Sequence, residues 1–300
     1  MQTTNLHTAW ARLFVRALAD AGVRDLVVSP GSRSTPLALA AAAERALRCH
    51  VHVDERVAGF FALGQARATG RPTALVCTSG TAGSHWVPAA VEASIAGVPL
   101  VCITADRPWE AYDCASPQTV DQHDVLGPHA RHRAELGTPN PSPSALRAVA
   151  RIAAQCVHRS RWPLPGAVHI NARFRKPLEP VDVPTPEHWE PHVDALLSRS
   201  APAVYEPPCA APREAVEALS RALRKARRAW VVCGPTLTHD PARAQSTREA
   251  IARLCQLTGA ALQRRAQVFV AVEELLVQIG RAISRGRVGP RFEQPGHAGG

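Results

Sequence analysis

The 300-residue chain has one methionine, two tyrosines and very little lysine. Only Lys176 and Lys225 are lysines, so the formal net charge of +10 comes almost entirely from arginine. The arginines are scattered along the chain, and no aromatic residues alternate with them as they would in a nucleic-acid-binding stripe. We therefore expect no nucleic-acid partner.

The sequence also lacks a long apolar run. A membrane-spanning helix needs about 20 such residues, whereas the longest runs here, residues 73–77 and 98–103, have the length of buried strands. The segment Met1–Leu18 carries Arg12 and Arg16 and has neither the apolar core nor the cleavage site of a signal peptide. These features predict a cytoplasmic protein without a membrane span that starts as a mature chain.

The eight cysteines form no C-x-x-C pair and show no regular spacing. Several of them, such as Cys77 and Cys102, lie inside apolar runs, where a thiol behaves as a small buried hydrophobic group. The pattern argues against a disulfide framework and fits the reducing cytoplasm.

Helical and strand-like segments alternate in the first half of the chain. Helices are predicted at Leu6–Ala21, Pro36–Leu47, from about Glu55, and at Trp86–Ala96 and Ala145–Val157. Strands are predicted at Asp25–Ser29, Cys49–Val53, Thr73–Thr78, Pro99–Thr104 and Gly166–Asn171. Because the strands are almost continuously apolar, we expect an α/β fold whose parallel sheet is covered on both faces.

Composition suggests four regions. Residues 1–180 are expected to form the α/β domain, and the proline-rich residues 181–212 a linker. Residues 213–262 begin a second α/β domain, predicted to be incomplete because one strand between two helices is too little sheet to be stable. Residues 263–300 are predicted to be an atypical, partly disordered tail with one short helix near Val270–Ile283, as a frameshift or premature end would produce.

The conspicuous loops all follow predicted strands. They are Pro30–Thr35, Asp54–Glu55, Thr78–Ala82 and Asp106–Pro108. Since the carboxyl ends of parallel strands meet at one edge of a sheet, these loops should converge on a binding site there. The Thr78–Ala82 turn lacks the lysine of a P-loop and the spacing of a dinucleotide fingerprint, so by itself it identifies no ligand.

Four short stretches, taken in order, resemble one known domain. They are SPGSRSTP (residues 29–36), HVDER (52–56), TSGTA (78–82) and TADRP (104–108). Together they are similar to the N-terminal pyrimidine-binding domain of the 2-succinyl-5-enolpyruvyl-6-hydroxy-3-cyclohexene-1-carboxylate synthase (MenD) family, and GAVHIN (166–171) resembles that domain's final strand. The similarity covers about residues 5–180 and weakens from 215 to 262.

The resemblance implies a thiamine-diphosphate-dependent transferase of menaquinone biosynthesis. Its family decarboxylates 2-oxoglutarate and adds the succinyl unit to isochorismate, with Mg²⁺ holding the cofactor's diphosphate. Family members are homo-oligomers, and the active site forms between the pyrimidine domain of one subunit and the diphosphate domain of another. The homologous chain here would supply one half of such a site.

Glu55 is the catalytic residue that the resemblance implies. A carboxylate bonded to the ring nitrogen of the aminopyrimidine favours its protonation, which activates the cofactor. The alternative is a solvated acid in the first turn of a helix, where negative charge is favoured.

Further binding residues follow from the same resemblance. Contacts to the cofactor are implied for Pro30, Ser79, Gly80 and Thr81, and contacts to the substrates for Ser32, Arg33, Arg107 and Gln118. Without the resemblance, Arg33 would be a surface arginine, Arg107 an ion-pair partner of Asp106, and Gln118 a solvated loop amide.

The sequence contains no Gly-Asp-Gly motif with a downstream asparagine, on which this family binds Mg²⁺ and the diphosphate. We therefore predict no metal site in this chain and expect it to be inactive alone. The alternative, from a different functional class, is a non-catalytic truncated product or a dimerising partner of an intact subunit.

A metal-dependent hydrolase is the remaining alternative. His50, His52 and Asp54 alternate, so all three side chains would lie on one face of a strand. However, Glu55 stands where such families place another histidine. Three more histidines, His123, His129 and His132, are predicted to lie in an exposed loop.

Overall fold

The computed structural model describes residues 5–183, 188–205, 210–226, 229–233, 241–258 and 261–264. Contacts divide the chain into two compact units, Met1–Glu206 and Pro207–Gly300. The helix predicted near Val270–Ile283 and the arginine-rich end lie outside the described residues.

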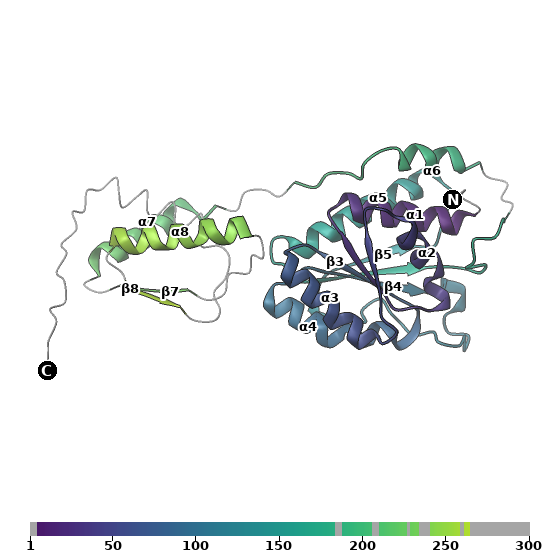
Figure 1. Ribbon diagram of the computed structural model, residues 1–300, viewed down its shortest axis with the longest axis horizontal. Helices are drawn as coiled ribbons and strands as arrows, with labels where there is room; N and C mark the ends of the chain where they lie inside the picture. Colours follow the sequence, from purple (N-terminus) through teal and green to yellow (C-terminus); the bar gives the residue numbers. More distant parts are fainter. Residues whose placement is uncertain are drawn as a thin grey trace. The chain divides into compact units, whose positions relative to one another are not determined.

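The first unit is built on a parallel sheet (Figure 1). The sheet has six strands in the order β2-β1-β3-β4-β6-β5. The strands are β1 (Asp25–Val28), β2 (Arg48–Val51), β3 (Thr73–Cys77), β4 (Leu100–Asp106), β5 (Ala130–Gly137) and β6 (Ala167–Arg173). The predicted α/β fold with a parallel sheet is confirmed.

Helices cover both faces of this sheet (Figure 1). One face carries α1 (Leu6–Asp20), α2 (Thr35–Ala43), α5 (Pro143–Arg161) and α6 (Glu190–Leu197), and the other carries α3 (Glu55–Thr69) and α4 (Val87–Ala96). Side chains of Asn5, Asp54 and Ser142 cap the first turns of α1, α3 and α5. Left-handed glycines, Gly70 and Gly97, end α3 and α4.

Strand residues alternate between two cores. Val28 and Ile103 join the core under α1 and α5, whereas Val27 and Cys102 join the core under α3 and α4. Both faces of the central strands are therefore buried, which explains why these strands are continuously apolar in sequence.

Strand β5 was not predicted. The segment was expected to be an exposed loop, but His132 lies within the strand and His129 ends the short 3-10 helix η4 (Gly127–His129) before it. β5 pairs on one side only, with β6, and many of its residues are partly exposed. An edge strand of this kind can carry charged residues, so its sequence lacks the apolar signal of the central strands.

The proline-rich stretch expected to be a linker contains a packed helix. Trp189, just before α6, is 3% exposed and Val193 within it is 1% exposed, and both join the core under α1 and α5. Burial of one large aromatic and one aliphatic side chain fixes this helix on the first unit, although the surrounding prolines indicate an irregular segment.

The described part of the second unit is a small βαβ arrangement. It contains α7 (Arg213–Lys225), β7 (Trp230–Cys233), α8 (Pro241–Thr258) and β8 (Ala261–Arg264), and the two strands pair in parallel. Val216, Ile251 and Leu254 form its core. Only one strand was predicted in this region, so β8 is an addition.

Among the described residues, no helix combines the length and the apolar character needed to cross a membrane.

Candidate functional site

The sheet reverses its strand order at β1. β2 lies on one side of β1 and β3 on the other, and ligands of open parallel sheets bind at the carboxyl edge near such a reversal. The loops that leave β1 and β3 lie at this edge. The two loops touch at Gly31, where an added Cβ would lie 2.4 Å from the Thr78 Cβ. Only glycine allows this approach, which explains the Pro30-Gly31 turn.

Glu55 lies at the first position of α3, which follows β2. Its side chain is half-buried, and it makes no hydrogen bond or ion pair with the residues that the structure describes. Asp54, in contrast, caps the helix by accepting from the Arg56 N–H at 2.9 Å. Burial, and then the nearby Glu55 carboxylate, raise the pKa of the Cys77 thiol at the end of β3. The Glu55 carboxylate thus acts electrostatically on this strand end, and no described residue hydrogen-bonds to it.

A second polar group in this part of the sheet also lacks a partner. Ser29 is completely buried, and its hydroxyl makes no hydrogen bond within the described part of the chain. Its N–H donates to the Val76 carbonyl at 2.8 Å, which extends the β1–β3 pairing by one step. By strand alternation its side chain lies on the face of Val27, the face that α3 covers. A buried polar group without a partner is uncommon in folded proteins.

Three side chains hold the loop after β3. Gly80, with φ +87°, donates its N–H to Gln122 Oε1 at 2.7 Å. Gln118 Nε2 donates to the Ser79 carbonyl at 2.9 Å, and Arg107 donates to the Ser79 hydroxyl. The Gly80 N–H is therefore already satisfied by the protein, while Thr81 is exposed.

Two arginines, Arg33 and Arg107, face the same edge. Arg33 Nη1 donates to the Phe174 carbonyl at 2.7 Å, and Arg107 Nη1 donates to the Gln118 carbonyl at 2.7 Å. Burial, and then the charge of Arg107, lower the pKa of Arg33. Neither guanidinium forms an ion pair within the described ranges. Pro30 and Ser32, in the same loop as Arg33, are exposed.

Gln118 is an exposed loop residue whose side-chain amide is bonded to the Ser79 carbonyl. Its backbone is left-handed, with φ +59°, as are those of Asp113 and Ala115, with φ values of 55° and 57°. Such strain persists only where surrounding bonds enforce it. Here the Gln118 carbonyl and side chain are both bonded, to Arg107 and Ser79, so the conformation is tied to the site.

A buried ionic network below these loops was not predicted. Asp106 accepts from Arg173 Nη1 at 2.9 Å, from Asn171 Nδ2 at 2.8 Å and from the Tyr112 hydroxyl at 2.6 Å. Arg173 is 1% exposed and its guanidinium lies 3.7 Å from the centre of the Trp109 ring. Asp106 therefore pairs with Arg173, and its contact with Arg107 is through the Arg107 backbone N–H at 2.7 Å.

One sequence signal could have revealed this network. Polar residues recur at every second position near the ends of two apolar strands, at Thr104 and Asp106 in β4 and at Asn171 and Arg173 in β6. The register pairs Thr104 with Asn171 and Asp106 with Arg173. Their common face is the one that α3 and α4 cover, because the residues between them belong to the other core.

His169 is a buried titratable group next to this network. Its Nε2 lies 2.8 Å from Thr104 Oγ1, and burial lowers its pKa to about 4. Between pH 6.5 and about 4 the unfolded chain therefore binds a proton that the folded chain does not. We expect the free energy of unfolding to fall by about 2–3 kcal/mol over this window.

The measurement is urea unfolding at pH 7 and pH 4.5. His169→Gln should reduce the loss of stability on acidification, whereas His85→Gln, at an exposed position, should leave it unchanged. An equal loss in the wild type and in His169→Gln would contradict the assignment.

The three residues considered as metal ligands of a hydrolase contact other side chains instead. His50 Nε2 lies 3.0 Å from Asp25 Oδ1, Asp54 binds Arg56, and His52 packs on Phe61 with ring centres 4.5 Å apart. Among the described residues, no group of three or more His, Cys, Asp or Glu side chains is arranged to hold a metal. These contacts give the hydrolase alternative no ligand set.

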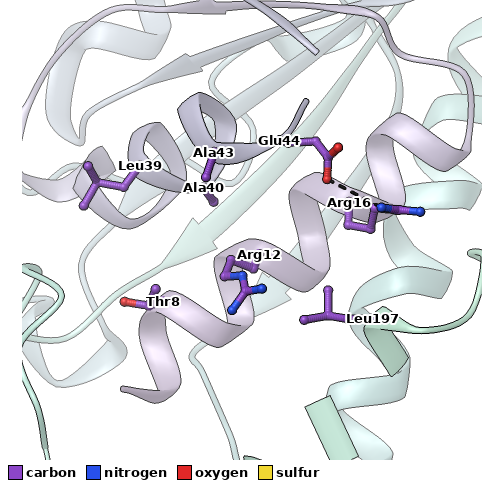
Figure 2. A pocket seen from close by; sticks show the side chains of 8 residues that line it. All are labelled: Thr8, Arg12, Arg16, Leu39, Ala40, Ala43, Glu44 and Leu197. Atoms are coloured by element: carbon purple, nitrogen blue, oxygen red, sulfur yellow. Dashed lines mark ion pairs between the residues drawn. The ribbon is translucent and has the colours of Figure 1, made fainter. Parts of the chain in front are cut away.

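A cavity of about 270 Å³ lies between α1, α2 and α6 (Figure 2). Its lining includes Arg16, Glu44 and Leu197. Arg16 donates to Asp20 at 3.0 Å and lies 4.0 Å from Glu44, so nearby acids compensate its charge. No loop of the carboxyl edge contributes to the lining, which separates this cavity from the site.

Sequence comparison identifies the class of protein that this fold and edge site define. Residues 8–125 match the family described as "Thiamine pyrophosphate enzyme, N-terminal TPP binding domain". The first unit is therefore an α/β domain of the thiamine pyrophosphate enzymes.

Comparison with individual relatives points to one synthase family within this class of enzymes. The chain is 57% identical over 260 residues to the 2-succinyl-5-enolpyruvyl-6-hydroxy-3-cyclohexene-1-carboxylate synthase of Sorangium cellulosum, a match that covers 86% of this chain and 42% of the relative. Synthases of the same name from Geobacillus kaustophilus and Myxococcus xanthus are 44% identical over 234 residues and 42% identical over 262 residues. These two matches cover 76% and 85% of this chain, and 39% and 43% of the relatives.

The comparisons confirm the predicted resemblance to the N-terminal part of this synthase family. The chain spans less than half the length of these relatives.

Proposed function

We propose that the first unit supplies the pyrimidine-binding wall of a thiamine diphosphate site. The whole protein would decarboxylate 2-oxoglutarate and add the succinyl unit to isochorismate, as a transferase of menaquinone biosynthesis. The observation that carries this proposal is the unpartnered Glu55 carboxylate, which begins α3 after β2 and acts electrostatically on Cys77 at the end of β3. We place the protein in the cytoplasm because its cysteine pattern fits a reducing compartment.

An aminopyrimidine ring would bind at this edge through its ring nitrogens. A ring nitrogen that donates a hydrogen bond would satisfy the Glu55 carboxylate, which lacks a partner in the described part of the chain. Thiamine diphosphate, when bound, supplies the carbon–carbon bond chemistry. Glu55 would hold a proton at the ring nitrogen, and the Pro30 and Ser79–Thr81 loops would line the ring.

The arginine pair fits the substrates. Both 2-oxoglutarate and isochorismate carry two carboxylates, and a guanidinium binds a carboxylate through two parallel hydrogen bonds. Arg33 and Arg107 lie near enough for their charges to interact, and an anion between them would relieve that repulsion. Ser32 and Gln118 would contribute polar contacts from the two adjoining loops.

The diphosphate and Mg²⁺ need ligands that this stretch of sequence does not provide. Mg²⁺ takes oxygen ligands such as carboxylates, and the sequence contains no Gly-Asp-Gly motif. We propose that these ligands come from an intact synthase subunit in a mixed assembly, because a second copy of this stretch of sequence would lack them too. The chain would then form half of a composite site.

A complementation experiment tests this proposal. The full chain is mixed with the Sorangium cellulosum synthase in which the glutamate that matches Glu55 is replaced by glutamine. Thiamine diphosphate, Mg²⁺, 2-oxoglutarate and isochorismate are added. We expect product from the mixture and almost none from either protein alone, because mixed assemblies would contain one complete site.

Native mass spectrometry shows whether mixed assemblies form. Mixed assemblies without product would overturn the catalytic proposal and favour a non-catalytic dimerising partner. Tight binding of thiamine diphosphate and Mg²⁺ by the chain alone, measured by calorimetry, would overturn the composite-site proposal.

A further inference from the structure

Gln122 is a buried side-chain amide whose oxygen and nitrogen are both bonded. It is completely buried, its Oε1 accepts from the Gly80 N–H at 2.7 Å, and its Nε2 donates to the Ala105 carbonyl at 3.3 Å and to Asn171 Oδ1 at 3.2 Å. These partners belong to the loop after β3, to β4 and to β6. Because the amide oxygen only accepts and the nitrogen only donates, no apolar or singly polar side chain of this size could replace it.

The conformation of the loop depends on this contact. Gly80 has a left-handed backbone, and an added Cβ there would lie 2.7 Å from Gln118 Cγ. Gly80 is buried, so its N–H would be an unsatisfied donor without Gln122. The contacts of Gln118 and Arg107 hold Ser79 and do not reach the Gly80 N–H.

The other end of Gln122 joins the buried ionic network. Asn171, which accepts from Gln122, donates to Asp106 at 2.8 Å and to Glu135 at 3.0 Å. Asp106 is followed directly by Arg107. The loop after β3 and the loop after β4 are therefore supported by one continuous set of buried hydrogen bonds.

We propose that Gln122 is the positioning residue of the Ser79–Thr81 loop, the residue that sets the place of this loop against a bound pyrimidine ring. The identity of the ligand rests on the proposed function, whereas the support of the loop rests on the hydrogen bonds alone. Gln122 itself does not reach the reacting atoms. It acts through Gly80, whose N–H it occupies.

Amide hydrogen exchange of the full chain, followed by NMR, tests the support of the loop. Gln122→Met keeps the approximate shape of the side chain and removes all three hydrogen bonds. We expect the Gly80 amide to exchange about tenfold faster or more, since it loses its acceptor, while amides in β1 change little. Gln118→Met is the matched control, because that side chain bonds the Ser79 carbonyl and leaves the Gly80 N–H protected.

Faster Gly80 exchange in Gln122→Met but not in Gln118→Met would support the proposal. Unchanged Gly80 exchange, or equal acceleration in both variants, would overturn it. If Gln122→Met does not fold, the wild-type chain is measured instead. NMR should then show a scalar coupling across the hydrogen bond between the Gly80 nitrogen and the Gln122 side-chain carbonyl. An absent coupling together with rapid exchange of the Gly80 amide would also overturn it.

The complementation mixture adds a functional readout. We expect Gln122→Met to raise the thiamine diphosphate concentration for half-maximal rate about tenfold, and the KM for 2-oxoglutarate much less. Equal effects on both would indicate a purely structural role. If the wild-type mixture gives no product, the proposed function fails, and the exchange data still decide the role of Gln122.

Discussion

Replacing Glu55 by glutamine is expected to lower product formation in the complementation mixture by about 10²–10⁴-fold, the usual contribution of a positioned proton-transfer group. Glutamine keeps the shape of the side chain and its oxygen can still accept a hydrogen bond. It loses the negative charge that would stabilise a protonated ring nitrogen. The measurement is the initial rate at saturating substrates and cofactor.

The matched control is Glu92→Gln, which changes an exposed acid on α4 and should leave the rate unchanged. Thermal unfolding should be nearly the same for the wild type and for Glu55→Gln, because the Glu55 carboxylate makes no hydrogen bond within the described residues. A rate within a few-fold of the wild type would show that Glu55 is only a first-turn acid.

Removing the buried cation Arg173 is expected to have the largest effect on stability. Arg173→Ala should reduce the free energy of unfolding of the first unit by about 3–5 kcal/mol, because it leaves the buried Asp106 carboxylate without its cation. The loss of packing against Trp109 adds to this cost. The change in the free energy of unfolding is measured by urea unfolding, with the hydrogen exchange of β4 and β6 amides as the probe.

Arg175 offers a matched control two residues further along the chain. It pairs with Glu110, but the two side chains are 49% and 55% exposed. Arg175→Ala should therefore cost less than about 1 kcal/mol. If Arg173→Ala destabilises the unit no more than Arg175→Ala does, the buried pair is not a major source of stability.

The buried network gives the edge site its rigidity. Three hydrogen bonds and an ion pair fix Asp106, which begins the loop that carries Arg107. Gln122 extends the same network to Gly80. Loops usually move more than the strands they connect, and here buried polar groups from β4 and β6 restrict two of them. This arrangement would hold a cofactor loop and a substrate-binding arginine in a fixed relation.

The sequence by itself determined the fold class and the edge where a site belongs. Continuous apolar strands alternating with helices require a parallel sheet covered on both faces, and the loops after such strands converge whatever the details of packing. Four ordered motifs also indicated the synthase family, and the comparisons confirm the resemblance. The placement of Glu55 at a helix start followed from the same local pattern.

The tertiary structure decided which polar groups have partners. Asp106 meets Asn171 across 65 residues of sequence, and Gly80 meets Gln122 across 42. Such pairs depend on the lateral order and register of the strands, and the periodicity of a single segment predicts neither. β5 and α6 were not predicted because their signals also depend on tertiary contacts. An edge strand can be polar, and a helix in a proline-rich segment is held by its contacts. Only the tertiary structure shows that the Glu55 carboxylate and the Ser29 hydroxyl make no hydrogen bond within the described residues.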